Sequence, residues 1–374
     1  MTRAKKPTLL MAGIVALLAT TSASGASPAP AYSVVTGWPQ LPAGTILGQV
    51  AGVAVDSGNT VIVFDRAENS FPGEGNRPGA MKTIRSAPVM GFNGDTGALV
   101  FFWGAGLFVH PHGLRVDSHD NIWLTDDGLQ QVFKYSHDGK LLLTVGTARS
   151  VGCDATHFNG PTDIAVEPDG SFYVADGYGS SRIAKFSADG QFLFSWGHCS
   201  NVPSENIMLY LSLEKFPGTE QFTSGLSSAR RLYDEPDAFN TPHDIVLDAQ
   251  TKLLYVADRD NSRIQVYDEA GKYVRTLKSP AMGRPWAISL GADRNLYVVD
   301  GGDLGDGPGR PGQEAIMKVD LSGKVLAKWS SFGNRDGQIF WGHDIAVGGD
   351  GAVYVGDVGH GMRVQKFAPG KTGK

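Results

Sequence analysis

Ser171-Phe-Tyr-Val-Ala-Asp176 is a short apolar run that ends in aspartate, and this chain of 374 residues repeats it with small changes. The other versions are Thr60-Val-Ile-Val-Phe-Asp65, Asn121-Ile-Trp-Leu-Thr-Asp126, Leu253-Leu-Tyr-Val-Ala-Asp258, Asn295-Leu-Tyr-Val-Val-Asp300 and Ala352-Val-Tyr-Val-Gly-Asp357. Each version follows a short apolar strand and a Gly/Asp/Asn turn, and two further strands come after it. Strands of about five residues joined by tight turns, at a period of roughly 40 to 50 residues, are typical of β-propellers. The sequence therefore predicts an all-β fold, a six-bladed β-propeller.

The last copy ends after Phe367, one strand short of the others. A segment near Tyr32–Trp38 could supply the missing outer strand, which would remove an open sheet edge. We therefore assign residues 38–374 to one propeller domain and residues 27–37 to a linker or closing segment.

The first 26 residues have the features of a secretory signal peptide. Basic residues precede an apolar run from Leu9 to about Ala19, and small residues at Ser24 and Ala26 offer a cleavage site. This run is too short for a membrane span, and no cysteine for lipid attachment follows it. We expect a secreted or periplasmic protein with no stable membrane anchor.

Composition narrows the classes of partner. The net charge is −5 and no basic run occurs, which argues against nucleic acid. Hydrophobic residues make up 41% of the chain, which is enough for a substantial core. We also expect the protein to be a monomer. Cys153 and Cys199 are the only cysteines, and in an exported chain they either form a disulfide or remain two separate thiols.

Three histidines open alternate copies of the repeat. The first strands read His112-Gly-Leu-Arg-Val-Asp, His243-Asp-Ile-Val-Leu-Asp and His343-Asp-Ile-Ala-Val-Gly, whereas the intervening copies open with Ala51, Thr162 and Trp286. In a ring of six copies, alternate positions lie 120° apart and their side chains can converge on the axis. Three imidazoles with an open fourth position form the ligand set of a catalytic zinc.

Strand direction predicts which loops share a face with these histidines. A first strand begins where the antiparallel second strand ends, so the loops after the second strands reach the same mouth of the channel. Arg66, Tyr178 and Arg259 lie in those loops. The arginines suit a carboxylate-bearing substrate, and a phenol beside a dication and arginines could have a lowered pKa and act as a base. The alternative for Tyr178, which lies between two glycines on what we expect to be a flexible turn, is an aromatic lid.

Other polar residues have simpler interpretations. The remaining histidines are expected on the surface or in turns, with His110 held in reserve as a substitute ligand. The aspartates that end the second strands are expected to bond loop amides, and Arg182 and Arg263 to be structural repeat residues. Asp344 and Asp244 directly follow ligand candidates, so either could orient an imidazole or bind a second, harder cation.

These residues resemble the peptidyl-α-hydroxyglycine α-amidating lyase family, whose propeller is built from NHL-type repeats. The resemblance runs from Trp38 to Phe367 and is strongest at Pro111-His-Gly-Leu, Pro161-Thr-Asp-Ile-Ala-Val-Glu-Pro, Asp176-Gly-Tyr-Gly-Ser-Ser-Arg-Ile, Ala257-Asp-Arg-Asp-Asn-Ser-Arg-Ile-Gln and Gly342-His-Asp-Ile-Ala. It implies a catalytic zinc held by His112, His243 and His343. It also implies a structural calcium held by Asp344 and the carbonyl groups of Val53 and Leu114.

The resemblance further implies a reaction. Arg66, Tyr178 and Arg259 match the active-site arginine, tyrosine and arginine of the family, and the activity implied is cleavage of a carbinolamide N–C bond to give a peptide amide and glyoxylate. The chain departs from the family at one pair of blade-bridging cysteines, where Asn159 and Gly179 stand instead.

Two alternatives remain open. One is a metal-dependent lactonase on a six-bladed propeller, although such enzymes normally hold calcium with carboxylate and amide ligands. The other is an exported NHL-repeat scaffold that binds protein or glycan and needs no metal.

Overall fold

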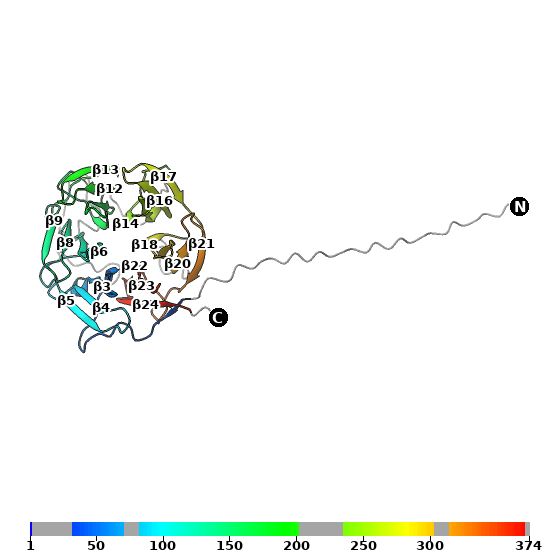
Figure 1. Ribbon diagram of the computed structural model, residues 1–374, viewed down its shortest axis with the longest axis horizontal. Coiled ribbons are helices and arrows are strands. Elements are labelled where there is room, and N and C mark those ends of the chain that lie inside the picture. The colour runs from blue at the N-terminus through cyan, green and yellow to red at the C-terminus, as the bar shows by residue number, and fades with distance from the viewer. Residues whose placement is uncertain (2–31, 71–81, 202–234, 303–313, 371–374) are drawn as a thin grey trace, which may run out of the picture.

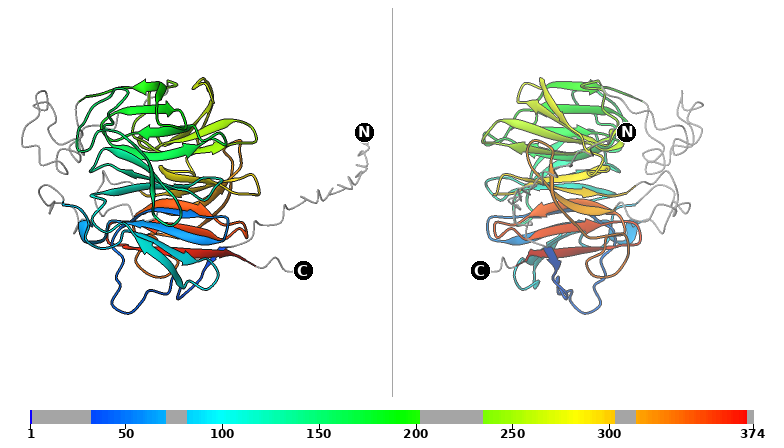
Figure 2. Two further views of the ribbon diagram at one scale, coloured as in Figure 1. Left: turned by 60° about the vertical axis from the view of Figure 1, so that its left-hand side comes forward. Right: turned by 90° about the vertical axis from the view of Figure 1, so that its right-hand side faces the viewer.

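Six four-stranded antiparallel sheets stand around a central axis in the computed structural model of the protein (Figure 1). The structure describes Met1 and residues 32–70, 82–201, 235–302 and 314–370. The expected signal peptide therefore lies outside the described residues. Figure 2 shows the ring of sheets from other directions. The six four-stranded sheets confirm the prediction of a six-bladed β-propeller.

The strands of each blade run outward from the axis in chain order, except that the outermost strand of blade 6 is the N-terminal β1. Blade 1 comprises β2 (Val50–Val55), β3 (Thr60–Asp65), β4 (Val89–Asn93) and β5 (Leu99–Trp103). Blade 2 comprises β6 (Pro111–Val116), β7 (Ile122–Asp126), β8 (Gln131–Tyr135) and β9 (Leu141–Val145). Blade 3 comprises β10 (Pro161–Val166), β11 (Phe172–Asp176), β12 (Ser181–Phe186) and β13 (Phe192–His198). Blade 4 comprises β14 (Pro242–Asp248), β15 (Leu253–Asp258), β16 (Arg263–Asp268) and β17 (Tyr273–Leu277). Blade 5 comprises β18 (Pro285–Leu290), β19 (Leu296–Asp300), β20 (Ala315–Val319) and β21 (Val325–Trp329). Blade 6 comprises β22 (Gly342–Val347), β23 (Val353–Asp357), β24 (Arg363–Pro369) and β1 (Tyr32–Val34). Two 3-10 turns, η1 (Ala67–Asn69) and η3 (Arg259–Asn261), follow second strands in blades 1 and 4.

The ring closes in two ways. Around the axis, each innermost strand contacts the innermost strands of its two neighbours, and β2 meets β22. On the outside, β1 pairs with β24, so the N-terminal segment completes the last blade. Tyr32 of β1 stacks on Trp329 of blade 5, with the ring centroids 4.2 Å apart. The closing strand therefore joins blade 6 to its neighbour as well.

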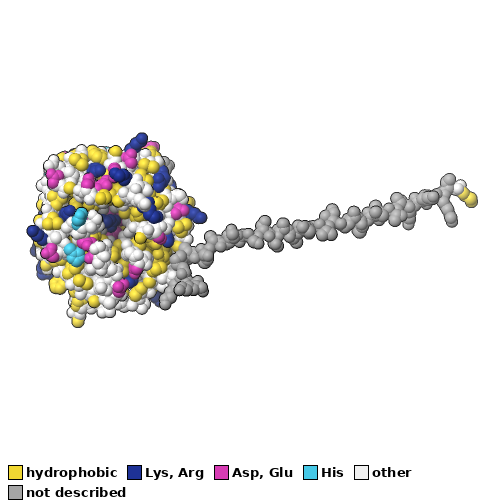
Figure 3. All heavy atoms as spheres, in the orientation of Figure 1, with side chains coloured by type: hydrophobic (Ala, Val, Ile, Leu, Met, Phe, Trp, Pro, Cys, Tyr) yellow, Lys and Arg dark blue, Asp and Glu magenta, His cyan; other side chains and the backbone are white. Residues whose placement is uncertain are grey.

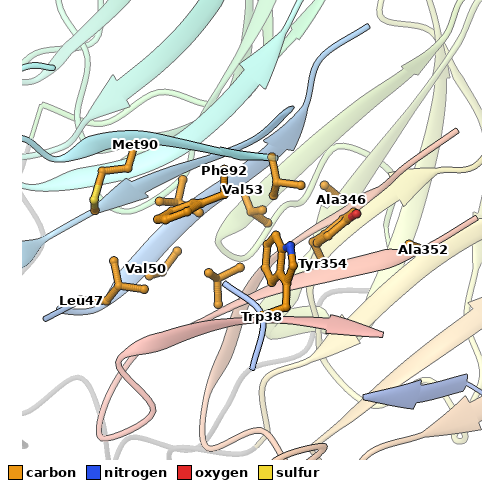
Figure 4. Packing of buried hydrophobic residues seen from close by; sticks show 12 residues of the cluster. Trp38, Leu47, Val50, Val53, Met90, Phe92, Ala346, Ala352 and Tyr354 are labelled. Atoms are coloured by element: carbon orange, nitrogen blue, oxygen red, sulfur yellow. The ribbon is translucent and has the colours of Figure 1, made fainter. Parts of the chain in front are cut away.

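The hydrophobic core lies between the faces of adjacent blades. Second strands such as β11 are buried along their whole length, whereas the outermost β13 alternates between half-buried and exposed residues. This contrast is expected because an inner strand is covered on both faces and an edge strand on one. Figure 4 shows the cluster between blades 1 and 6, where the Trp38 ring packs 5.0 Å from the Tyr354 ring and near Phe92.

Aspartates at the ends of the second strands hold the loops that lead into each blade. Each accepts a hydrogen bond from a backbone N–H about 17 residues earlier, as in Asn240 to Asp258 at 2.7 Å. The equivalent donors in the other blades are Gly48, Val109, Asn159, Arg284 and Trp341. Arg182 and Arg263 pair with the aspartate of their own blade at 2.9 and 2.6 Å. The structural interpretation of these residues is confirmed.

Two further features complete the fold. Cys153 and Cys199 form a disulfide that links the loops before and after blade 3. Asn159 and Gly179 lie against each other, since a Cβ added to Gly179 would collide with the Asn159 side chain. Among the described residues, no helix is long and apolar enough to cross a membrane.

Candidate active site

A bulge in every innermost strand presents the residue that opens the repeat. In all six blades the pairing between first and second strands slips just after the first residue, as between Pro242 and Asp244 of β14. The residue within the slip is His243 in β14, and the equivalent residues are His112 in β6 and His343 in β22. A bulged residue leaves the regular alternation of the strand, and such bulges re-aim side chains beside active sites. The sequence pattern alone did not reveal this device.

The three imidazoles converge on the axis. Their ring centroids are 4.6 to 4.8 Å apart, and one nitrogen of each lies within 4.8 Å of the others. All three residues are at most 3% exposed. The predicted meeting of alternate repeat positions at one mouth of the channel is therefore present in the structure.

Backbone carbonyl groups of the intervening blades orient these rings. The Nδ1 atoms of His112, His243 and His343 lie 2.7 to 2.8 Å from the carbonyl oxygens of Thr162, Trp286 and Ala51. A carbonyl oxygen only accepts, so each Nδ1 carries the proton and each Nε2 presents a lone pair. Each carbonyl belongs to the residue that opens the next repeat in the ring.

This donor set fits a zinc ion. The Nε2 atom of His343 is buried and has no hydrogen-bond partner in the part of the chain that the structure describes. Burial lowers the pKa of His112 to about 3, and it lowers the pKa of His243 and His343 well below the ordinary value. The imidazoles are thus neutral at pH 7, as metal ligation requires. Three neutral Nε2 donors match the set of protein ligands of a catalytic zinc.

Tyr178 reaches the same point from the loop after β11. Its hydroxyl lies 2.8 Å from Nε2 of His112 and 3.2 Å from Nε2 of His243, and it donates to one of them at a time. In the turn before it, Gly177 packs so closely against the Pro242 carbonyl that a Cβ would collide with it. Burial raises the pKa of the phenol, and Arg259 is the largest opposing influence. In the metal-free protein the phenol is therefore protonated at neutral pH.

The two arginines of the prediction have different surroundings. The guanidinium carbon of Arg259 lies 4.3 Å from the centroid of the Trp286 ring. The same carbon lies 5.7 Å from the centroid of the Tyr178 ring. Arg66 is tied to the scaffold, because its Nε donates to the Pro111 carbonyl and its Nη1 to the Gln49 side chain. Arg259 is thus the better placed of the two to meet a substrate beside Tyr178.

Sequence reasoning missed two parts of this site. Trp286 opens the fifth repeat and packs beside His243, with the ring centroids 5.1 Å apart. Its place at the opening of a repeat was the available signal. His110, expected on the surface or in a turn, is instead buried, and its Nδ1 lies 2.5 Å from Asp127 Oδ1. It is not one of the three converging histidines.

The donors expected for calcium do not fit that ion. Calcium takes six to eight oxygen ligands at about 2.3 to 2.6 Å. The Leu114 carbonyl accepts a hydrogen bond from Arg115 Nη1 at 2.9 Å, and the same nitrogen lies 3.3 Å from Asp344 Oδ1. Val53 meets Asp344 Oδ2 through its N–H at 2.7 Å, although the expectation assigned its carbonyl group to the metal. A side-chain cation already contacts two of the three expected ligands.

Comparison with known proteins relates the chain to amidating enzymes. The NHL repeat family model matches residues 158–186 and 239–267. Peptidyl-glycine alpha-amidating monooxygenase B of Xenopus laevis is 34% identical over 90% of this chain, which spans 35% of that relative's length. A probable peptidyl-alpha-hydroxyglycine alpha-amidating lyase of Caenorhabditis elegans is 31% identical over 83% of this chain and 79% of its own length.

Solved structures agree on the fold. A gluconolactonase of Xanthomonas campestris has a TM-score of 0.53 at 14% sequence identity, and the match covers 91% of this chain and 98% of that one. At this level of identity the likeness concerns the propeller alone.

Proposed function

Because this chain belongs to the peptidyl-alpha-hydroxyglycine alpha-amidating lyase family, we propose that it is a zinc-dependent carbon–nitrogen lyase. The substrate class is a peptidyl-α-hydroxyglycine or a similar carbinolamide with a free carboxylate, and the products are an amide and glyoxylate. The observation that carries the proposal is the convergence of three buried, neutral imidazoles beside Tyr178. A lactonase with carboxylate and amide ligands would not need this donor set.

Arg259 is proposed to hold the substrate carboxylate. Its guanidinium is partly fixed by Asp260, whose Oδ1 lies 3.1 Å from its Nε, and by the Trp286 ring beneath it. A preorganised guanidinium can bind a carboxylate through two parallel hydrogen bonds. Arg66 adds positive charge near His112 and Tyr178, and its Nε donates to the carbonyl group of Pro111, the residue before His112.

Tyr178 is proposed to move the proton. As phenolate it accepts the proton of the α-hydroxyl group, the hydroxyl oxygen forms a carbonyl with the α-carbon, and the bond from that carbon to the amide nitrogen breaks. The phenol then returns the proton to the departing nitrogen, so no oxidant or water is consumed. Arg259 favours the phenolate, because a nearby positive charge opposes the effect of burial.

His112, His243 and His343 are proposed to hold zinc through Nε2. When bound, the ion supplies Lewis acidity that lowers the pKa of a hydroxyl group beside it. The carbonyl groups behind each Nδ1 keep the rings in the ligating orientation without the metal.

The decisive experiment is an assay of purified protein with α-hydroxyhippurate. We expect benzamide and glyoxylate in equal amounts, loss of activity with a zinc chelator, and recovery on addition of zinc. Hippurate, which lacks the hydroxyl group, is the control and should release neither product. Absence of glyoxylate from the zinc-loaded protein with every carbinolamide tested would reject the proposed reaction.

We also propose that the protein is exported. This rests on the sequence of residues 1–26, with their basic start, apolar run and small-residue cleavage site.

A further inference from the structure

A second charged cluster lies in the channel below the histidines. Arg115 follows His112 by three residues on β6, about 10 Å along the strand. Its guanidinium reaches across the channel to three buried carboxylates from other blades: Nη2 lies 2.6 Å from Asp163 and 2.7 Å from Asp244, and Nη1 lies 3.3 Å from Asp344. Figure 3 looks along the same axis and shows basic and acidic side chains together in the central hollow.

We propose that the Arg115 guanidinium replaces the structural calcium of the family, so that the ring of this protein is tied by a side-chain cation. The inference concerns ring closure and does not depend on the reaction proposed above. It rests on the position of Arg115 Nη1, which occupies the space beside Leu114 O and Asp344 Oδ1. A calcium ion at bonding distance from those two oxygens would need the same space.

Each of the three carboxylates also accepts a hydrogen bond from the backbone of the next blade. Asp163 of blade 3 accepts the backbone N–H of Ile245 in blade 4. Asp244 of blade 4 accepts that of Ile288 in blade 5, and Asp344 of blade 6 accepts that of Val53 in blade 1. Arg115 itself comes from blade 2. One guanidinium therefore joins three carboxylates whose contacts extend around the complete ring.

Asp163, Asp244 and Asp344 each directly follow the residue that opens their repeat, and blade 2 has Gly113 at that position. A Cβ on Gly113 would lie 2.7 Å from Asp163 Oδ1, so the glycine leaves room for this arrangement. The planar guanidinium carries five N–H donors, which suits several carboxylates at once better than a spherical ammonium does. A hollow of about 240 Å³ is lined by Arg115 together with Ile164 and Ile245, so it adjoins the guanidinium of the cluster.

The test compares calcium binding and melting of the wild-type protein and Arg115→Met. After exposure to calcium and gel filtration in calcium-free buffer, wild-type protein should retain zinc but no stoichiometric calcium. Its melting temperature should be the same in EGTA and in calcium. Arg115→Met leaves three buried carboxylates without a cation, so its melting temperature should fall by about 5 °C or more. Added calcium should restore much of that loss in Arg115→Met.

Arg182→Met is the matched control. Arg182 is also buried and pairs with an aspartate, Asp176, but inside blade 3 and away from the channel. Its loss should destabilise the protein in a way that calcium does not correct. One tightly bound calcium per wild-type chain, or a lower wild-type melting temperature in EGTA at unchanged zinc content, would overturn the proposal even if Arg115→Met does not fold.

Discussion

His112, His243 and His343 form a ligand set only because other residues fix their rings. Ala51, Thr162 and Trp286 have no chemistry in common, yet each offers a backbone carbonyl to the histidine of the preceding repeat. Repeats 2, 4 and 6 thus supply the imidazoles, and repeats 1, 3 and 5 supply the carbonyl groups that accept the Nδ1 protons. A substitution at Ala51 or Thr162 that preserves the backbone should therefore leave the metal site intact.

His243→Ala should remove most of the bound metal while the propeller stays folded. Two imidazoles cannot complete the set of three protein ligands that zinc requires, and the mutated residue lies in a bulge outside the regular pairing. Zinc per chain, measured by elemental analysis, should fall from about one to near zero. His198→Ala, an exposed substitution at the end of β13, is the control and should keep its zinc. Full zinc content in His243→Ala would exclude His243 as a ligand.

Tyr178→Phe should lower kcat by a factor of about 10² to 10⁴ and leave zinc bound, because only the proton acceptor is removed. The ring keeps its edge contacts with the rings of His112 and His243. Tyr173→Phe is a matched control in the same blade, since that hydroxyl bonds Glu167 within the core and should have little effect on kcat. A wild-type kcat for Tyr178→Phe would reduce the tyrosine to a lid over the site.

Strands of the propeller have different tasks according to their place in the blade. Innermost strands of blades 2, 4 and 6 carry the converging histidines as their bulged second residues, second strands end in the aspartates that hold the entry loops, and outer strands shield the core. The short β1 has a further role, because it covers the edge of β24 and packs Tyr32 on Trp329. An uncovered strand edge invites pairing with another chain.

A variant that begins at Thr36 therefore lacks β1 and should be both less stable and prone to self-association. It keeps Trp38, whose packing against Tyr354 belongs to the core of blades 1 and 6. We expect a lower melting temperature and dimers or larger species that grow with concentration, measured by light scattering. The control is a variant that begins at Tyr32, which retains β1. A monomeric shortened protein with an unchanged melting temperature would show that β1 is dispensable.

On the scale of the whole molecule, two sites in one channel join blades that are far apart in the sequence. The proposed zinc ligands come from blades 2, 4 and 6, and the Arg115 cluster involves every blade through its backbone contacts. A ligand that binds only the closed ring stabilises it by mass action. Metal content and ring stability should therefore change together.

Removal of zinc should lower the melting temperature of the wild-type protein. At free zinc about 1,000 times the dissociation constant, binding contributes about 4 kcal/mol, which corresponds to roughly 5 °C for a domain of this size. Calorimetry with and without a zinc chelator measures the difference. His243→Ala should melt at one temperature under both conditions, because it has lost the site. An equal chelator effect on both proteins would mean that the stabilising metal lies elsewhere.

The repeat pattern alone was enough to predict the six blades, the closing strand and the three histidines on one face. Strand length, turn residues and the alternation of His112, His243 and His343 are local or periodic properties, and local signals of this kind survive in the linear chain. The aspartates that hold the loops were predictable for the same reason, since they recur at one position of the repeat.

The three-dimensional arrangement decided what occupies the channel. Arg115 looks like an ordinary residue of an inner strand, and the buried state of His110 has no signature in its own segment. Which cation meets Asp163, Asp244 and Asp344 depends on side chains from four blades that approach across the axis. The carbonyl groups that fix the imidazoles likewise come from neighbouring repeats. Such contacts join residues 43 to 292 positions apart, so only the closed ring brings them together.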